Sequence, residues 1–524
     1  MAYGDDITEG IPYVLSNPAG ATNYSATGVN YDMAIAGQPF FIAASDDSPY
    51  RRVTAKYRKE QYDQTREAGE QSLTGWWFRS QSTFHLGAGI KYFEPAQDES
   101  LRFQYTESKG VEVFTKGQVT LLNTTASFYS GAAPAQLIGV NDGTNDCIVI
   151  TDGTAIKKIT SAAVSTTFTQ AGTPATIFSI TTNGKQYFFI NGTHVHRGNL
   201  AGSTSDTEIY NASSTTRGTI RFVKQRLIAA INNAIYELDT NNASGALPTA
   251  LFTHPNTSWV WSSISEGPSA IYISGYDPNG TSSSVFKIVL DVTTSNSLGF
   301  PTLETPTAII DLPEGERIND FDVYLGTYAV LATSLGFRVG IADATGDIQY
   351  GPLLFRDAAC SSIAFRDSYA YIATLVDGAA GLVRVDLSTT VLANSLFFPW
   401  AWDLIATGTT TTASQVAFFG NSDRAAFTNG NNTWAESTTS LVAEGYLRTG
   451  YIRYNTLETK IFKLMQARVD TTNGGLTIQS IDAVDNFYTL GVFSQESIVP
   501  EININYPQTA QEYLGFQFTL TRST

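Results

Sequence analysis

Five acidic residues in one short segment could carry out acid–base chemistry. The segment "IDLPEGERINDFDVYL" contains the carboxylates Asp311, Glu314, Glu316, Asp320 and Asp322. Glycoside hydrolysis needs two carboxylates that face one glycosidic bond, one as an acid and one as a base or nucleophile. The alternative is a solvated loop followed by strand turns, without a catalytic role. We expect the second interpretation, so the sequence predicts no catalytic residue and no enzyme.

Two short patterns offer ligands for a metal ion. His194 and His196 are two residues apart on a predicted strand, so both side chains point to one face. No second cluster of ligands accompanies them, and we expect two surface histidines. The loop 141–146, "NDGTND", is rich in oxygen ligands but departs from the EF-hand pattern, which leaves a loop calcium ion as an alternative. No nucleotide-binding motif or nucleophile elbow is present, so we predict no cofactor and no metal.

The composition narrows the class of protein. Only 15% of the 524 residues are charged, against a usual ~25%, while 42% are hydrophobic. Abundant Thr, Ser, Asn and Gly with β-branched and aromatic residues are typical of an all-β protein from a virion or the extracellular space. The net charge is −16, and the only basic run, at 51–70, is mixed with acids. We therefore expect no nucleic-acid partner.

Cysteine content and hydropathy give three further expectations. Cys147 and Cys360 lie in apolar, strand-like contexts, and we expect two buried free thiols. No apolar run approaches 18 residues, so we expect no membrane insertion. The first residues lack the basic and apolar regions of a signal peptide, and we expect no secretion signal.

A repeated pattern in the middle of the chain predicts the fold that must hold these residues. A turn, a strand, a tight turn and a second strand recur seven times at intervals of about 40–50 residues, from "GTNDCIVITDGTAIKKI" to "NSDRAAFTNGNNTWA". Asp152-Gly153 and Asn191-Gly192 suit two-residue hairpin turns. Further strands precede each copy. This is the signature of a β-propeller at 126–440, with about seven blades, although six or eight remain open. The segment 110–123 or one after Ala435 is expected to supply a closing strand.

The flanking regions do not show the repeat. Residues 1–125 read as an extended N-terminal arm and docking segment, and the charged stretch 47–72 is either a solvated arm or a short docked helix. Residues 441–524 contain long alternating strands with turns at 473–475 and 485–486. That pattern predicts a C-terminal antiparallel β-sandwich.

An aromatic stretch near the N-terminus is the most specific sequence motif in the chain. "AGQPFFIAASDDSPYRR", "GEQSLTGWWFRSQSTFHLGAGIKYFEP" and "SKGVEVFTKGQVTLLN" resemble the N-terminal signature of minor tail proteins from long-tailed phages of actinobacteria. The similarity continues into "GYLRTGYIRYNTLETKIFKLMQARV" near the C-terminus. It covers most of the chain, and in the repeats only the pattern matches.

The resemblance implies a structural virion protein at or near the tail tip. Its partners would be other phage tail proteins, and copies of the chain would form a homo-oligomer, three or a multiple of three around the tail axis. It carries over no catalytic residue. The expected anchors of the stretch lie against the propeller or against a neighbouring tail protein; they are Trp76, Trp77, Phe78, Arg79, Phe84, Tyr92 and Phe93, with His85 as a further polar contact.

The surface composition also suggests a ligand at the host cell. Aromatic residues flanked by Asn and Asp suit sugars, and Tyr276, Trp400 and Trp402 are the candidate contacts for a host cell-surface glycan. Two alternatives of other classes stay open: a propeller glycoside hydrolase that degrades host polysaccharide, and a lectin without a role in assembly.

Overall fold

The computed structural model describes most of the chain beyond residue 80. The described residues are 81–93, 103–453, 459–468, 474–493 and 510–523, with gaps at 132–133, 135, 172–174, 202–204, 215–216, 394 and 463. The backbone of strands β1 to β5 and of β44 is described as well. Every helix or strand element in these residues is a strand, which confirms the all-β prediction.

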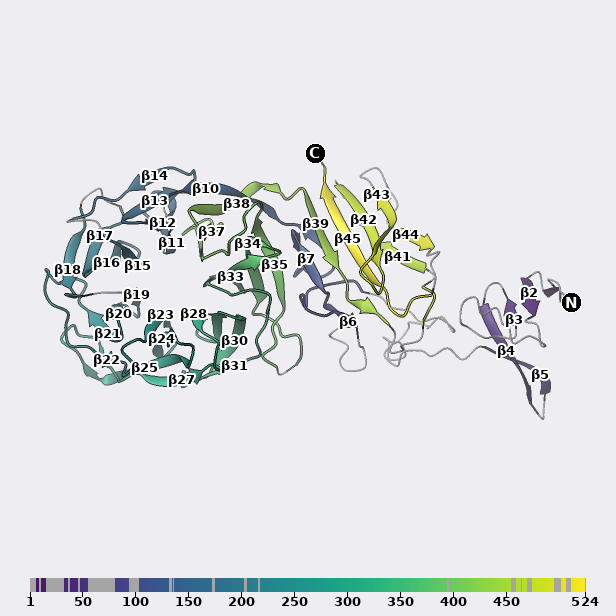
Figure 1. Cartoon of the computed structure of the whole chain (residues 1–524), viewed down its shortest axis with the longest axis horizontal. Coiled ribbons are helices and arrows are strands. Elements are labelled where there is room, and N and C mark those ends of the chain that lie inside the picture. The colour runs from purple at the N-terminus through teal and green to yellow at the C-terminus, as the bar shows by residue number, and fades with distance from the viewer. Residues whose placement is uncertain are drawn as a thin grey trace. The chain divides into compact units, whose positions relative to one another are not determined.

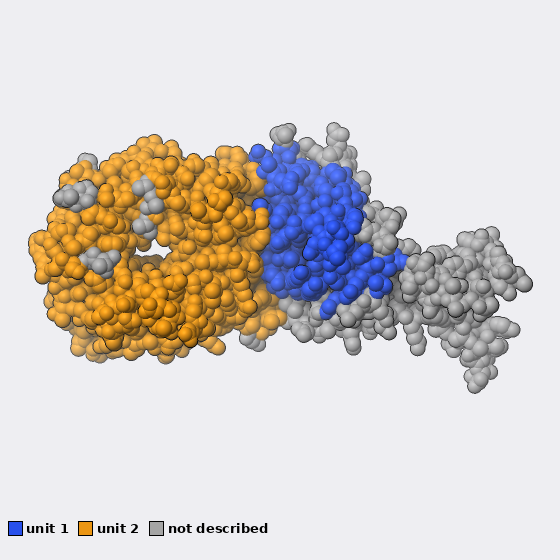
Figure 2. Space-filling view, viewed as in Figure 1, with its two compact units in different colours: residues 1–121, 443–524 blue, residues 122–442 orange. Residues whose placement is uncertain are grey.

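The chain divides into two compact units. Unit 1 contains residues 1–121 together with 443–524, and unit 2 contains residues 122–442 (Figure 2). The sequence predicts 1–125 and 441–524 as separate parts, whereas both ends of the chain belong to unit 1.

The described residues of unit 2 form seven antiparallel sheets of four or five strands. The first three are β11 (Leu137–Asn141), β12 (Asp146–Asp152), β13 (Ala155–Thr160) and β14 (Ser165–Thr167); β15 (Ile177–Thr182), β16 (Gln186–Asn191), β17 (His194–Asn199) and β18 (Thr207–Asn211); and β19 (Gly218–Val223), β20 (Arg226–Ile231), β21 (Ala234–Leu238) and β22 (Phe252–Thr253). Each sheet is a meander, as the repeated turns predict.

The next three sheets follow the same order. They are β23 (Val260–Glu266), β24 (Ala270–Tyr276), β25 (Ser283–Ser295), β26 (Pro301–Leu303) and β27 (Thr307–Asp311); β28 (Ile318–Tyr324), β29 (Tyr328–Thr333), β30 (Gly336–Ala342) and β31 (Ile348–Tyr350); and β32 (Ser362–Arg366), β33 (Tyr369–Val376), β34 (Ala379–Asp386) and β35 (Trp400–Ala406). The last sheet combines β36 (Gln415–Phe418), β37 (Ala425–Asn429) and β38 (Asn432–Leu441) with β10 (Asn123–Ser130).

The sheets are arranged in a ring. The first strand of each sheet contacts the first strand of the next, in the order β11, β15, β19, β23, β28, β32 and β36, and β36 contacts β11 again. Figure 1 shows the sheets around a common centre, and Figure 2 shows an opening there. Unit 2 is therefore a β-propeller, in which each sheet buries its faces against its neighbours.

The ring is closed by a strand from the N-terminal side of unit 2. β10 pairs antiparallel with β38, and Ala126 lies opposite Ala435. The prediction that 110–123 supplies this strand is wrong, because its strands β8 (Val111–Glu112) and β9 (Thr120–Leu121) pair with each other. The closing strand begins at Asn123, where the expected segment ends. Its residues are largely polar and partly exposed, so the pattern of hydrophobic residues does not predict this strand.

The apolar cores of unit 2 lie between adjacent sheets. Between the first two sheets, for example, Val149 and Ile156 pack with Ile180 and Phe189. Cys147 belongs to the same cluster and is fully buried. Cys360 is also buried, and both cysteines are free, which confirms the prediction.

The described residues of unit 1 beyond residue 80 are built around a five-stranded sheet. Its order is β43 (Phe487–Phe493), β42 (Gly474–Ile481), β45 (Gly515–Arg522), β39 (Glu444–Arg448) and β7 (Glu107–Lys109), so segments from both ends of the chain share it. Met465 and Ala467 of β41 (Leu464–Arg468) pack with Ile478 of this sheet. β41 pairs with β44 (Glu501–Asn505), and β40 (Tyr451–Ile452) pairs in parallel with β6 (Tyr92–Phe93).

A separate sheet comes from the start of the chain. Its strands follow the chain order β1 (Asp6–Thr8), β2 (Ile11–Leu15), β3 (Met33–Ile35), β4 (Gln38–Ser45) and β5 (Ser48–Thr54). In the described residues of the whole chain, no helix has the length and apolar character that crossing a bilayer requires.

Candidate functional site

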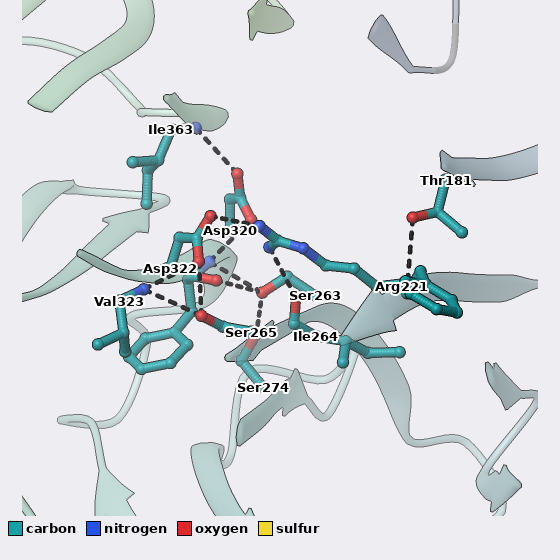
Figure 3. Close-up of polar contacts among 12 residues, drawn as sticks. Thr181, Arg221, Ser263, Ile264, Ser265, Ser274, Asp320, Asp322, Val323 and Ile363 are labelled. Carbon is teal, nitrogen blue, oxygen red and sulfur yellow. Dashed lines mark hydrogen bonds and ion pairs between the residues drawn. The ribbon is translucent and has the colours of Figure 1, made fainter. Parts of the chain in front are cut away.

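A polar cluster lies on the first strands of three sheets in unit 2. It comprises Arg221 on β19, Ser263 and Ser265 on β23, and Asp320 and Asp322 on β28, and we call it the inner-strand polar cluster (Figure 3). Asp320 and Asp322 are two residues apart on one strand, so their side chains share a face. The cluster includes two of the carboxylates that the sequence analysis considered for catalysis.

Asp322 is held by a cation, a hydroxyl and its own backbone neighbour. The Arg221 guanidinium donates to Oδ2 at 2.7 Å, and the Ser265 hydroxyl donates to Oδ1 at 2.5 Å. The Val323 amide also donates to Oδ1, at 2.9 Å. Burial lowers the pKa of Arg221, but the charge and hydrogen bond of Asp322 outweigh it and raise that pKa overall. Arg221 therefore remains a cation beside Asp322.

Asp320 accepts hydrogen bonds from two backbone amides in the described part of the chain. The Ile363 amide of β32 donates to Oδ2 at 2.9 Å, and the Phe321 amide donates to Oδ1 at 2.9 Å. Burial raises the pKa of Asp320 to about 6, and the neighbouring charge of Asp322 adds to the effect. Asp320 is thus a carboxyl that titrates near neutral pH.

The serines of the cluster connect β23 to β28. The Phe321 amide donates to the Ser263 hydroxyl, and the Val323 amide donates to the Ser265 hydroxyl, both at 2.9 Å. Each first strand is the inner edge of its sheet, so its amides need acceptors from outside the sheet. Short polar side chains on the preceding first strand supply those acceptors.

The same arrangement recurs between β15 and β19. The Ile220 amide donates to the Ser179 hydroxyl at 3.1 Å, and the Phe222 amide donates to the Thr181 hydroxyl at 3.0 Å. At the contact between β28 and β32, the Ile363 amide of the later strand likewise donates to the Asp320 side chain of the earlier one. Most groups of the inner-strand polar cluster therefore hold adjacent sheets together.

The other acidic candidates do not join this cluster. Glu316 is buried, and both of its carboxylate oxygens accept hydrogen bonds from the Arg338 guanidinium, the shortest at 2.7 Å. Asp311 accepts from the Ser284 hydroxyl at 2.6 Å. Glu314 is exposed in the turn before β28. Of the five carboxylates, only Asp320 and Asp322 therefore lie together, so they are the one pair of this segment left to consider for glycoside hydrolysis.

The candidate metal ligands have protein partners. His196 Nδ1 lies 3.1 Å from Asp206, and His194 Nδ1 lies 3.0 Å from Glu208. His196 is buried, which differs from the expectation of two surface histidines. In the described part of the chain, no three His, Cys, Asp or Glu side chains are placed to hold a metal ion.

The loop considered for calcium is stabilised internally. Asp142 accepts from the backbone amides of Thr144 and Asn145 and from Lys158 Nζ, at 2.6 Å in the last case. The hydrogen bond from Lys158 holds the pKa of Asp142 well below its ordinary value. Its oxygens are therefore engaged with the protein.

The aromatic anchors are only partly covered by the structure. Trp76, Trp77, Phe78 and Arg79, with the side chain of Phe93, lie outside the described residues. Phe84 packs edge-on against Tyr105 with ring centres 6.2 Å apart. Tyr92 packs against Tyr451 at 5.6 Å and Tyr513 at 5.4 Å. All of these partners belong to unit 1, a location that neither predicted alternative included.

The three candidate glycan contacts are not brought together at one site. Tyr276 ends β24 half-buried, with the Arg317 guanidinium 5.8 Å from its ring centre. Trp400 on β35 is only 9% exposed and packs edge-on against Phe355. Trp402 lies two residues further along the same strand. Trp400 in particular offers little surface to a ligand.

A hollow that the sequence analysis missed lies between two sheets of unit 2. Its volume is about 450 Å³. We call it the turn hollow because the β19–β20 turn forms part of its lining. The lining residues are Phe222, Lys224, Gln225, Arg226, Glu266, Leu290, Phe300 and Pro301. The only signal in the sequence is the turn "VKQR", which lacks the Gly or Asn usual at such a position.

Comparison with known proteins gives a similarity of fold only. No family model matches the chain, and no curated protein matches it. Among solved structures, virginiamycin B lyase from Staphylococcus aureus is 12% identical with a TM-score of 0.44, covering 61% of this chain and 99% of its own. The Cps50 (Swd1) beta-propeller domain of Myceliophteria thermophila is 11% identical with a TM-score of 0.42, covering 60% of this chain and 100% of its own. At these values the similarities carry no argument about function.

Proposed function

We propose that this chain is a structural minor tail protein of a phage virion, at or near the tail tip. The observation that supports a structural role most directly is the use of polar groups in unit 2. The side chains of the inner-strand polar cluster bind amides of neighbouring sheets, which favours a rigid ring over an open catalytic centre. The phage assignment itself rests on the resemblance of the sequence.

The finer architecture forms part of the proposal. We read the seven sheets of unit 2 as seven blades, each formed by one copy of the repeat, with β10 completing the last. We read the five-stranded sheet of unit 1, with β41 and β44 packed on it, as a β-sandwich that makes assembly contacts. The propeller then serves as a platform between these contacts and the host surface.

The proposed partners follow from this role. Other tail proteins bind the N-terminal segment and the sandwich, and copies of the chain form a homo-oligomer, with three as the expected number. A host cell-surface glycan is the proposed external ligand. No enzymatic activity is proposed.

Immunogold electron microscopy of intact virions tests the location. The antibody would be raised against the full chain and selected for binding to unit 2. Gold at the distal end of the tail supports the proposal. Gold elsewhere on the virion, or disrupted virions without the protein, refutes it.

One observation favours an enzymatic alternative. The raised pKa of Asp320 is a property that general acids share. A glycoside hydrolase would release reducing ends from host cell-wall polysaccharide, and Asp320→Asn and Asp322→Asn would abolish that release. Equal release by wild type and both variants would indicate a contaminating enzyme and leave the structural role.

A further inference from the structure

We propose that the turn hollow binds a neutral sugar ring. It lies between the sheet of β19 to β22 and the sheet of β23 to β27, and its volume of about 450 Å³ falls within the ~300–1,000 Å³ of small-molecule sites. Its use against a host glycan rests on the proposed function, whereas the binding itself does not.

The first argument is the apolar part of the lining. Phe222 and Phe300 are both half-buried, so part of each ring remains accessible. Leu290 and Pro301 extend the same lining. The C–H face of a sugar ring packs on aromatic and aliphatic surface of this kind, because both are apolar while the sugar's hydroxyl groups point outward.

The second argument is that Arg226 is a buried and firmly held part of the lining. Arg226 donates to Glu237 at 2.9 Å and to the Pro301 carbonyl at 2.6 Å, and its guanidinium lies 5.1 Å from the Phe300 ring centre. Its side chain is only 1% exposed. Arg226 therefore holds Phe300 and Pro301 in the wall of the hollow, so the surface on which a sugar ring would pack is preformed.

The third argument is backbone strain at the same turn. Lys224 and Gln225 have φ values of 50° and 61°, a conformation that Gly or Asn usually adopts. Lys224 has a structural reason to be there, because its Nζ donates to the Pro268 carbonyl at 2.9 Å. Gln225 is exposed, and no hydrogen bond of its side chain is seen to the described residues. Its amide can both donate to and accept from a hydroxyl group.

The fourth argument concerns charge. Lys224 lies 3.6 Å from Glu266, and Arg226 is paired with Glu237, so the cations and anions around the hollow balance. An anionic ligand would have to compete with these carboxylates for the cations. A neutral ring with several hydroxyl groups can instead accept from the cations and donate to Glu266, whose side chain is 51% exposed.

The test is saturation-transfer difference NMR on the full chain. The probes are methyl α-D-glucopyranoside, methyl α-D-galactopyranoside and methyl α-D-mannopyranoside, with sodium glucuronate as the acidic comparison. We expect at least one neutral glycoside to bind in the millimolar range and more tightly than glucuronate. Phe300→Ala and Gln225→Gly should each weaken that binding by about tenfold or more, because they remove a stacking surface and a hydrogen-bonding amide.

The variants are chosen so that misfolding cannot explain the result. Gln225→Gly relieves a positive φ and should leave the protein at least as stable as wild type. The matched control is Asp367→Gly, which relieves the φ of 53° in the turn between β32 and β33, outside the hollow. The control should bind the glycoside as wild type does.

Three outcomes would overturn the proposal. They are no binding by any neutral glycoside, stronger binding of glucuronate, and unchanged binding in both Phe300→Ala and Gln225→Gly. None of them alters where gold particles lie on the virion, so the site and the tail role fail separately.

Discussion

The ionisation of Asp320 should make the stability of unit 2 depend on pH. Its pKa is raised from 3.8 to about 6, chiefly because burial disfavours the charged form. Between these two values the folded protein holds a proton that the unfolded chain releases, so the free energy of unfolding falls as pH rises. At about 1.4 kcal/mol for each pH unit, the loss is at most ~3 kcal/mol and is complete above about pH 6.

Asp320→Asn removes this ionisation and leaves the shape nearly unchanged. The amide oxygen of the new residue can keep the bond from the Ile363 amide, but its NH₂ group cannot accept from the Phe321 amide. That loss costs about 1 kcal/mol at every pH. The variant should therefore be less stable than wild type by ~1 kcal/mol at pH 4 and more stable by up to ~2 kcal/mol at pH 8.

Scanning calorimetry of the full chain from pH 4 to pH 8 measures this difference. Carboxylates far from position 320 are common to both proteins, so their contributions cancel when the two melting temperatures are subtracted. At roughly 2 °C per kcal/mol, the variant should melt about 2 °C lower at pH 4 and up to about 4 °C higher at pH 8. A difference that stays constant across this range would refute the reasoning.

Asp322→Asn is the matched comparison on the same face of β28. It removes the repulsion that contributes to the raised pKa of Asp320, but it also removes the negative charge that pairs with Arg221, and the one amide oxygen can replace only one of the two carboxylate oxygens that accept from Arg221 and Ser265. We expect a lower melting temperature at every pH, and no increase at pH 8. Opposite effects of two neighbouring Asp→Asn changes at pH 8 would distinguish a repelled carboxylate from a paired one.

Three further predictions concern packing and reactivity in unit 2. Ser263→Ala removes one of the two acceptors of the Phe321 amide, which keeps only Asp320 Oδ1, and should lower the free energy of unfolding by about 1 kcal/mol in urea titration; an unchanged midpoint would contradict a contribution from this bond. Gly139→Ala places a methyl group on the carbonyl oxygen of Phe418, so the ring should close poorly and the soluble yield should fall, whereas a normal yield and melting temperature would count against this packing. Burial raises the pKa of Cys360 to about 12, so a disulfide reagent at pH 8 should label it only after unfolding; rapid labelling of native protein would disprove its burial.

The repeat in the sequence was sufficient to predict the sheets of unit 2. Apolar alternation and the glycines after Asp152 and Asn191 predicted the hairpins. The two-residue turns are Gly153-Thr154 and Gly192-Thr193, one residue later than the predicted Asp-Gly and Asn-Gly pairs, because Asp152 and Asn191 are still paired in their strands. The positive φ values are those of Gly153 and Gly192, 65° and 58°. The closing strand was mispredicted, because β10 carries "NTTASFYS", which is largely polar and partly exposed. Its place is set by pairing with β38, far along the chain, and not by a pattern of its own.

The polar cluster illustrates a second limit of the sequence. The carboxylates of Asp320 and Asp322 are visible in one short segment, but the partner of Asp322 is 101 residues away. β19, β23 and β28 become neighbours only when the sheets assemble into the ring. The hydrogen bonds of Asp322 to Arg221 and Ser265 therefore cannot be predicted from the spacing of these residues in the sequence. The turn hollow is hidden for the same reason, since its lining comes from two different sheets.

The contact between β19 and β23 is bridged by a long cationic side chain, whereas hydroxyl side chains bridge the contacts on either side of it. At the β15–β19 and β23–β28 contacts, side chains of the earlier strand accept amide protons from the later one. At β19–β23, Arg221 of the earlier strand donates to the Ile264 carbonyl at 2.7 Å. A long cationic side chain there spans both β23 and Asp322, where a serine could reach only one neighbour. The turn hollow opens between these same two sheets, so the structural exception and the proposed binding site share one interface.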